Sequence, residues 1–152
     1  MALSKAQIGK SGELLVQYRL LLCGIESAPM STDTGVDLVA FSPSDGNART
    51  IQVKTNLKAK PGGGTGKEAL DWWLREDSPA ELVALVDLSG EQIWLMTHAE
   101  VEEIAQQRSG GRFHLYMYTD PTVQPRKDDR PVRHWEFQRF LLENHVHTTF
   151  RI

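Results

Sequence analysis

The sequence is poor in the features that mark several large protein classes. It has 152 residues and a single cysteine, Cys23, so no intrachain disulfide can form, which fits a reducing compartment. No stretch approaches the roughly 18 consecutive apolar residues that span a bilayer. The first residues, MALSKAQIGKSGELL, lack the apolar core of a signal peptide. We therefore expect a cytoplasmic protein without a membrane partner.

A surplus of positive charge is also missing, since the net charge is −3 at pH 7. Residues 1–70 carry eight Lys or Arg against six Asp or Glu, residues 71–119 three against nine, and residues 120–152 six against five. The acidity is thus concentrated in the middle of the chain. Three acids of the first segment are candidates for site or turn positions: Glu13, Asp33 and Asp37. Because a bound divalent cation changes the local charge, the low net charge weakens a nucleic-acid partner without removing it.

The hydrophobic periodicity predicts one domain over residues 1–152, an α/β (α+β) sandwich with a central mixed sheet flanked by helices. A motif-bearing core over about 4–118 is followed by a loop and helix over 120–152. The segment EALDWWLRE (68–76) is expected to be a helix or an irregular aromatic segment. One of Trp72 and Trp73 should lie in the core and the other should be partly exposed, where base stacking is an alternative role. The expected helices are 4–23, 98–108 and 132–145, and the expected strands are 25–30, 36–41, 49–55, 81–88, 92–97 and 112–118.

The first expected helix has recognisable ends and an unusual start. Ser4 and Gln7 form a capping-box pattern, and Gly24 stands where a C-terminal glycine belongs. Gly9 and Gly12 each cost about 1 kcal/mol in a helix relative to alanine, so either the first turns are irregular or a neighbour approaches the backbone closely. The spacing i, i+1, i+4, i+7, i+8 predicts one buried face, made of Leu14, Leu15, Tyr18, Leu21 and Leu22.

The stretch GGGTGK (62–67) looks like a phosphate-binding loop but lacks two of its defining positions. Pro61 stands where the first glycine is needed, and Glu68 stands where a hydroxyl should hold magnesium. We therefore expect no nucleotide cofactor. The stretch is interpreted as a flexible surface loop, or as a loop that touches a nucleic-acid backbone through its flanking lysines.

A second constellation combines two carboxylates, an amide and an ammonium group. Gln52 and Lys54 alternate along an expected strand and share one face. A hairpin through the turn-forming SPSDGN (42–47) brings Asp37 toward them, and a helix packed on this sheet directs Glu13 to the same edge. Carboxylate and carbonyl oxygens suit magnesium, and a neighbouring lysine can orient the attacking water. The set therefore predicts a site for metal-dependent hydrolysis.

These residues carry a resemblance to a known family. GKSGELLVQYRL (9–20), GVDLVAF (35–41) and IQVKT (51–55) resemble the three motifs of the PD-(D/E)XK nuclease superfamily, which includes Holliday junction resolvases and many restriction and homing endonucleases. The resemblance implies a restriction-endonuclease-like core and cleavage of DNA that leaves a 5′-phosphate and a 3′-hydroxyl. It also implies that Glu13, Asp37, Gln52 and the Val53 carbonyl hold Mg²⁺, which Mn²⁺ can replace, and that Lys54 positions the water.

Two positions depart from the family pattern. Val36 replaces the proline, which has no chemical role, and Gln52 replaces the acid, which offers a carbonyl oxygen without charge. The alternative is therefore a catalytically inactive module that binds nucleic acid or a protein partner. Because one small domain rarely cuts both strands, a homodimer or larger homo-oligomer is expected. The lysines expected to contact the DNA backbone are Lys5, Lys10, Lys58, Lys60 and Lys67.

Overall fold

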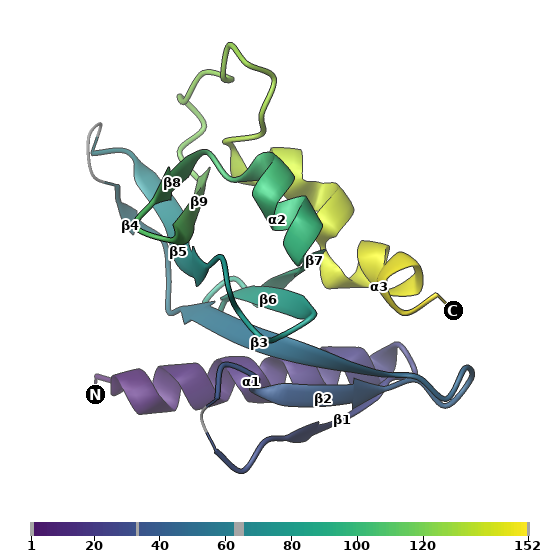
Figure 1. Cartoon of the computed structure of the whole chain (residues 1–152). Helices are drawn as coiled ribbons and strands as arrows, with labels where there is room; N and C mark the ends of the chain where they lie inside the picture. The colour runs from purple at the N-terminus through teal and green to yellow at the C-terminus, as the bar shows by residue number, and fades with distance from the viewer. Residues whose placement is uncertain (1, 33, 63–65, 152) are drawn as a thin grey trace.

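The structure is a computed structural model that describes residues 2–32, 34–62 and 66–151. Its helices and strands form two packed sheets with helices on the outside (Figure 1). Among the described residues, no helix combines the length and apolar character that crossing a bilayer requires. The elements are α1 (Lys5–Leu22), β1 (Glu26–Pro29), β2 (Leu38–Phe41), β3 (Ala48–Asn56), β4 (Lys60–Pro61), β5 (Glu68–Arg75), β6 (Leu82–Asp87), β7 (Gln92–Thr97), α2 (His98–Ile104), β8 (Gln107–Ser109), β9 (Arg112–Tyr118), the 3-10 helix η1 (His134–Phe140) and α3 (Leu142–Phe150).

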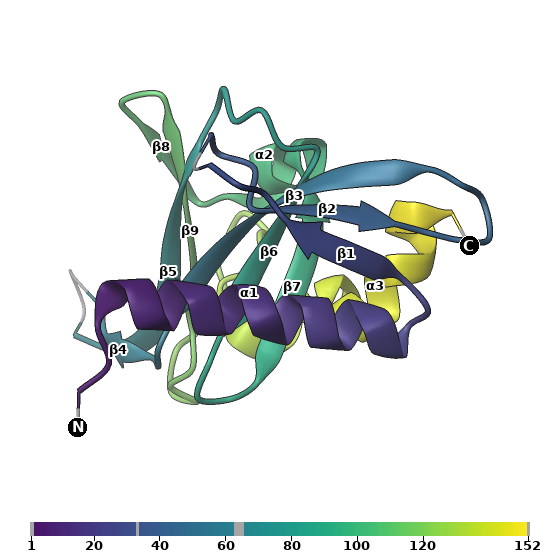
Figure 2. The ribbon, with the colours of Figure 1, turned by 90° about the horizontal axis from the view of Figure 1, so that it is seen from below.

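The larger sheet, sheet A, has five strands in the order β1-β2-β3-β6-β7. Strands β3 and β6 are parallel and the other neighbours are antiparallel, which confirms the mixed sheet. Strand β6 is apolar along its length because both faces of the sheet are covered there. One face packs against α1 and α3 (Figure 2). The α+β sandwich with a mixed sheet flanked by helices is therefore confirmed.

The other face of sheet A packs against a second sheet, sheet B, with strand order β4-β5-β9-β8. The prediction for residues 68–76 was wrong, because they form strand β5 rather than a helix. Burial alternates along β5, and seven of its residues pair with β9, so the long-range partner overrides the local helix-forming residues. The alternation places Trp72 in the core, at 3% exposure, and leaves Trp73 at 38%. One core and one partly exposed tryptophan were predicted, and this is confirmed.

Helix α1 has the predicted ends but a different buried face. Ser4 and Gln7 form the capping box, and Gly24 takes a left-handed φ of 82°. The residues packed against sheet A are Gly12, Val16 and Leu20. The predicted buried face was wrong in four of its five members: Leu14, Tyr18, Leu21 and Leu22 are 54–68% exposed, and only Leu15 packs at the edge of the core.

The close approach of α1 to β3 explains that choice of face. A Cβ at Gly12 would lie 1.8 Å from Thr55 Oγ1, so a side chain there would clash with β3. Thr55 is therefore the close neighbour of the helix backbone that the glycine at position 12 predicted. At Gly9 an added Cβ would meet nothing within 4 Å. The contact at Gly12 therefore selects one of two apolar stripes on α1 for burial.

The helices of the C-terminal half differ in length from the predicted ones. Helix α2 begins at the Thr97–Glu100 capping box and ends at Ile104, since the residues after it leave the helix to form β8. The predicted helix 132–145 is instead η1 followed by α3, with an extended Leu141 between them. Helix α3 is tied to α2 by His145, whose Nε2 lies 2.8 Å from Glu100 Oε2. Burial raises the pKa of Glu100, but hydrogen bonds from Thr97 and His145 outweigh burial and leave that pKa below its ordinary value.

Candidate functional site

The contact that defines the site joins Asp37 to strand β3. The Asp37 carboxylate, through Oδ2, accepts a hydrogen bond of 2.7 Å from the Val53 amide, and the Asp37 amide donates to the Ile51 carbonyl at 2.9 Å. The carboxylate therefore lies against the peptide between Gln52 and Val53. The hairpin pairing of β2 with β3 produces this placement, because Leu38 is paired with Ile51.

Strand β3 has an open edge at this point. Since β2 begins at Leu38, opposite Ile51, no residue of β2 pairs with β3 from Gln52 onward on that side. Along a strand the N–H and C=O of one residue point to the same side. The Val53 carbonyl therefore points to the edge at which Asp37 lies, and the site has one carboxylate and one peptide oxygen there.

The glycine before the aspartate has a structural reason. Gly35 has a φ of +89°, in the left-handed region that favours glycine. A Cβ there would also lie 3.0 Å from Pro79 Cδ. Gly35 thus lets the chain turn sharply into β2 while the loop before β6 packs against it.

Gln52 is held by a residue that the sequence did not identify. The Ser78 hydroxyl donates to Gln52 Oε1 at 3.3 Å and accepts from the Ala80 amide at 3.3 Å. An amide oxygen accepts two hydrogen bonds, so one lone pair of Gln52 Oε1 is not used by Ser78. Gln52 lines a groove of about 620 Å³ together with Thr34, Gly35, Arg75, Asp77, Ser78 and Pro79.

Lys54 and Glu13 approach β3 from different sides. Val53 packs in the core beneath α1, so Gln52 and Lys54 project from the opposite face of the sheet. Glu13 belongs to α1 and directly follows Gly12, the residue in close contact with Thr55. It is partly buried. The structure therefore joins Asp37 to β3 by direct hydrogen bonds and places Glu13 beside the same strand through the helix contact.

The side-chain and main-chain oxygens at this edge suit a hard divalent cation. Magnesium prefers carboxylate, carbonyl and water oxygens, and these are the groups that Asp37, Glu13, Gln52 and Val53 offer. Within residues 2–32, 34–62 and 66–151, no three Asp, Glu, His or Cys side chains are grouped as a metal site. The predicted set holds only two such side chains, so it does not depend on a group of three. Asp33, a candidate from the sequence, lies outside the described residues.

Three of the five predicted DNA-contacting lysines gather in a second groove. Lys5, Lys58 and Lys60 line a space of about 480 Å³ between the start of α1 and the end of β3. Lys10 is exposed on α1 and does not line this groove. Lys67 lies at the β4–β5 turn, where its Nζ donates to Thr122 Oγ1 at 2.8 Å.

The glycine-rich stretch closes the hairpin between β4 and β5. The Gly62 amide donates to the Lys67 carbonyl, and Pro61 pairs with Glu68. Residues 63–65 of this stretch lie outside the described residues. The stretch leads into a strand, whereas a phosphate-binding loop leads into a helix whose N-terminus faces the phosphates.

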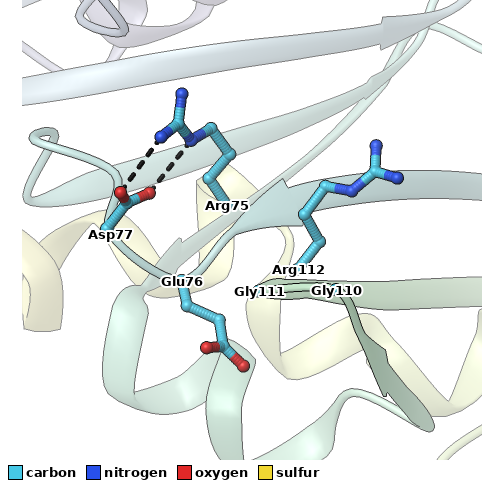
Figure 3. Close-up of a pocket in the computed structure, with 6 residues that line it drawn as sticks. All are labelled: Arg75, Glu76, Asp77, Gly110, Gly111 and Arg112. Atoms are coloured by element: carbon cyan, nitrogen blue, oxygen red, sulfur yellow. Dashed lines mark hydrogen bonds and ion pairs between the residues drawn. The ribbon is translucent and has the colours of Figure 1, made fainter.

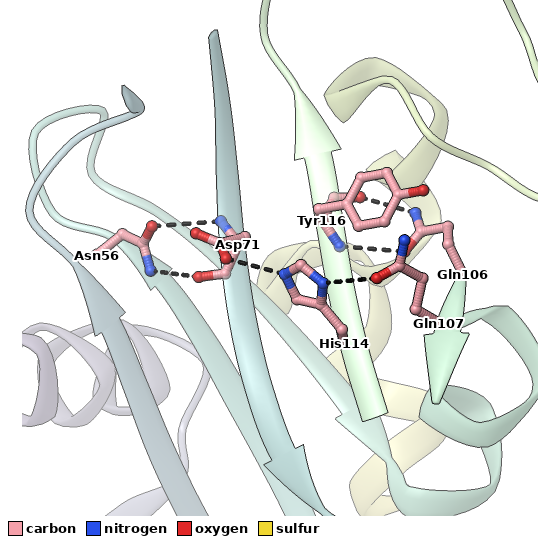
Figure 4. A network of polar contacts seen from close by, with 6 residues as sticks. All are labelled: Asn56, Asp71, Gln106, Gln107, His114 and Tyr116. Carbon is pink, nitrogen blue, oxygen red and sulfur yellow. Dashed lines mark hydrogen bonds and ion pairs between the residues drawn. The ribbon is translucent and has the colours of Figure 1, made fainter. Parts of the chain in front are cut away.

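A row of polar side chains connects the site to sheet B (Figure 4). The Asn56 side chain at the end of β3 pairs with the main chain of Asp71, donating at 2.9 Å and accepting at 3.3 Å. The Asp71 carboxylate lies 2.9 Å from His114 Nε2, and His114 Nδ1 lies 3.3 Å from Gln107 Oε1. The sequence did not reveal this row, because it depends on β5 being a strand.

Comparison with solved structures identifies the fold. The structure is similar to that of a bacterial homing endonuclease, I-Ssp6803I, with a TM-score of 0.61 and 16% sequence identity over 97% of this chain and 92% of that chain. It is also similar to Hjc, a Holliday junction resolvase of Archaeoglobus fulgidus, with a TM-score of 0.49 and 17% identity over 70% of this chain and 81% of that chain. No protein-family model matches the sequence, and no curated protein matches it.

The first of these similarities confirms the fold that the sequence motifs implied, because this chain shares it with a homing endonuclease. At 16% identity the similarity concerns the fold alone. It covers nearly the whole chain and so extends into the C-terminal segment, about which the three motifs are silent.

Proposed function

We propose that this chain is a single nuclease-like domain and a metal-dependent endodeoxyribonuclease of the PD-(D/E)XK type. Asp37, Glu13, Gln52 and the Val53 carbonyl would hold magnesium, which manganese can replace. The observation that carries the proposal is the 2.7 Å hydrogen bond between Asp37 and the Val53 amide. It sets a carboxylate beside the Gln-Val-Lys triplet at the open edge of β3. The fold shared with a homing endonuclease supports the same reading.

The residues around this edge divide the chemistry between them. Held by Asp37, Glu13, Gln52 and the Val53 carbonyl, magnesium would lower the pKa of a coordinated water and neutralise charge on the scissile phosphate. Lys54, two residues after Gln52 on the same face, donates hydrogen bonds that orient the attacking water and stabilise the negative charge of the transition state. Ser78 fixes the Gln52 amide so that its oxygen stays near the edge. The products would be a 5′-phosphate and a 3′-hydroxyl.

The DNA backbone would follow β3 from one groove to the other. Gln52 lines the first groove and Asn56 the second, with Lys54 between them on the same face of the strand. Lys5, Lys58 and Lys60 then contact phosphates beyond the cleavage point. Lys10, exposed on α1, and Lys67, at the β4–β5 turn, would make outlying contacts. The DNA substrate would thus be bound chiefly through its backbone.

A second copy of the chain would cover the exposed stripe of α1. Leu14, Tyr18, Leu21 and Leu22 each expose more than half of their side chains on one side of the helix. Cutting both strands of a duplex requires two sites, which a homodimer or larger homo-oligomer supplies. Burial of this stripe against its symmetry mate would place two copies of the site in one particle.

Cleavage of supercoiled plasmid and of a branched DNA junction, with magnesium or manganese, tests the proposal. Wild type should cut, while Lys54→Ala and Asp37→Asn should not. Asp37→Asn keeps an oxygen to accept from the Val53 amide, so it removes the charge with little change in packing. Lys127→Ala, an exposed lysine in the loop after β9, is the matched control and should cut normally. Cutting that survives in Lys54→Ala and Asp37→Asn would refute the proposed site.

A second candidate function is favoured by Gln52, which brings no charge and is already bound by Ser78. In that case the same fold would bind nucleic acid or a protein without cutting. Calorimetry separates the two functions, because the nuclease requires binding of magnesium or manganese that Asp37→Asn weakens. Wild type that binds neither metal would favour the inactive module.

A further inference from the structure

The outer face of sheet B carries a row of aromatic and basic side chains next to the candidate cleavage site. The inner face of the sheet is apolar and packs on sheet A. On β5 the outward residues include Asp71, Trp73 and Arg75, and across from Trp73 and Arg75 on β9 lie His114 and Arg112. A solvated sheet face of this kind is normally polar. The aromatic content therefore calls for a ligand.

Trp73 is held in place by two groups from β9. The His114 ring lies parallel to the Trp73 ring, with centroids 4.2 Å apart and planes 3° apart, and the Arg112 guanidinium lies 4.9 Å from the Trp73 ring. His114 is itself fixed by the Asp71 carboxylate at 2.9 Å. Trp73 nevertheless remains 38% exposed. Because His114 and Arg112 both lie over the ring, a planar ligand would stack on the indole in place of the Arg112 guanidinium, while the His114 contact keeps the indole in position and lowers the entropy cost of binding.

Arg112 supplies positive charge on the outer face of sheet B. Arg75, its partner across the strands, forms two hydrogen bonds with Asp77, which lower the pKa of that carboxyl below its ordinary value. Among the described residues no carboxylate pairs with Arg112. Figure 3 shows Arg75 and Arg112 projecting from neighbouring strands, with Arg75 joined to Asp77. They line a groove of about 520 Å³ together with Glu76, Asp77 and the Gly110–Gly111 turn.

The position of Trp73 links this face to β3. Asp71 and Asn56 both line the groove that holds Lys5, Lys58 and Lys60. Arg75 and Gln52 both line the groove beside Ser78. Trp73 lies between Asp71 and Arg75 on β5, just as Lys54 lies between Gln52 and Asn56 on β3. Each groove is thus lined by both strands, and Lys54 and Trp73 hold the corresponding middle positions of β3 and β5.

We infer that the outer face of sheet B binds unpaired nucleotides of the DNA substrate, with Trp73 stacking on a base and Arg112 contacting a phosphate. Bases in a duplex are already stacked on each other, so an exposed aromatic surface selects single-stranded or unstacked segments. This inference rests on the proposed function, because it assigns the substrate to DNA that contains unpaired nucleotides near the scissile bond.

The test measures binding of a fluorescently labelled oligo-dT of about 20 nucleotides by anisotropy in EDTA, so that no cleavage occurs. Loss of one base–aromatic stack weakens binding about tenfold, and this is expected for Trp73→Ala, whereas Trp73→Phe should restore most of the affinity. Arg112→Gln should reduce the slope of log affinity against log salt by about 0.7, the value for one phosphate contact on a single strand. Arg49→Gln, near the start of β3 where that strand pairs with β2, should change neither affinity nor slope.

Tryptophan fluorescence gives a second readout. The chain has four tryptophans, and Trp72 and Trp94 are buried. Quenching by oligo-dT that Trp73→Phe abolishes would support stacking on Trp73. Oligo-dT affinity that neither Trp73→Ala nor Arg112→Gln changes, or no binding at all, would overturn the inference while plasmid cleavage could still establish the nuclease. If Trp73→Ala and Arg112→Gln both bind oligo-dT more weakly but the wild type does not cut DNA, the binding surface is supported and the proposed nuclease activity is refuted.

Discussion

Two glycines three residues apart on α1 should respond in opposite directions to the same substitution. In an exposed helix interior, Gly→Ala stabilises by about 1 kcal/mol because alanine restricts the unfolded chain and favours helix. Nothing lies within 4 Å of a Cβ at Gly9, so Gly9→Ala should show this full gain. For a chain of this length 1 kcal/mol corresponds to about 2–4 °C in Tm.

Gly12→Ala should lose stability instead. The new Cβ would lie 1.8 Å from Thr55 Oγ1 and 2.9 Å from both Cβ and Cγ2 of Thr55. Rotation of the Thr55 side chain moves the hydroxyl but leaves Cβ in place, so α1 must shift away from β3. Overpacking of a tight contact costs about 1–3 kcal/mol, and a contact this short belongs at the upper end. After the helix-forming gain, the net loss is about 2 kcal/mol, or about 4–8 °C in Tm.

Thermal and urea unfolding of both single variants, and of Gly12→Ala combined with Thr55→Ala, measure the effect. Truncation of Thr55 removes two of the three clashing atoms, so the double variant should recover part of the loss, with a coupling energy of about 1–2 kcal/mol. Because Glu13 follows Gly12, the displaced helix should also lower metal affinity. If Gly12→Ala raised Tm as much as Gly9→Ala, the close packing of α1 on β3 would be refuted, along with the placement of Glu13 derived from it.

Three further predictions concern the metal set, pH and assembly. Gln52→Glu should tighten magnesium binding by roughly tenfold, because a carboxylate adds a full charge to the ligand set; unchanged calorimetry would exclude Gln52 as a ligand. The pKa of Glu100 is held below its ordinary value of 4.5, so its contribution to stability is present above that pH and is lost as the pH falls through the folded-state pKa. Glu100→Gln should therefore flatten the fall of Tm below pH 4.5, and an unaltered pH profile would contradict the role of its contact with His145. Leu22→Glu, in the exposed stripe of α1, should reduce the particle mass measured by light scattering, whereas Leu3→Glu, outside the stripe, should not. A Leu22→Glu protein with the same mass as the wild type would refute the α1 interface.

The sequence predicted those parts of the fold that depend on neighbouring residues. The capping boxes at Ser4 and Thr97 depend on residues three apart, and Asp37 reaches β3 because a short hairpin joins them. Strand β5 was mistaken for a helix because its alternation is set by pairing with β9, some forty residues later. The buried face of α1 was missed for a similar reason, since the contact of Gly12 with Thr55 decides between two apolar stripes.

Ser78 and Asp71 escaped prediction because their roles arise only when distant segments meet. The loop that carries Ser78 reaches Gln52 from 26 residues away, and no local pattern indicates that contact. Asp71 became relevant only once β5 was seen as a strand, with its main chain bound by Asn56. Gly35 is part of the GVDLVAF motif, but its φ of +89° and its contact with Pro79 have no local pattern that could reveal them.

The pairing of Asn56 with Asp71 has a consequence for how the two surfaces work together. It ties β5 directly to the end of β3, two residues beyond Lys54. Trp73 is two residues beyond Asp71 and is held by His114, which Asp71 also binds. The indole and the lysine are therefore connected through short, hydrogen-bonded segments of strand, and strands deform less than loops. A nucleotide stacked on Trp73 would fix the position of the neighbouring backbone relative to Lys54, so the sheet B surface would select which phosphodiester bond is cut as well as which DNA is bound.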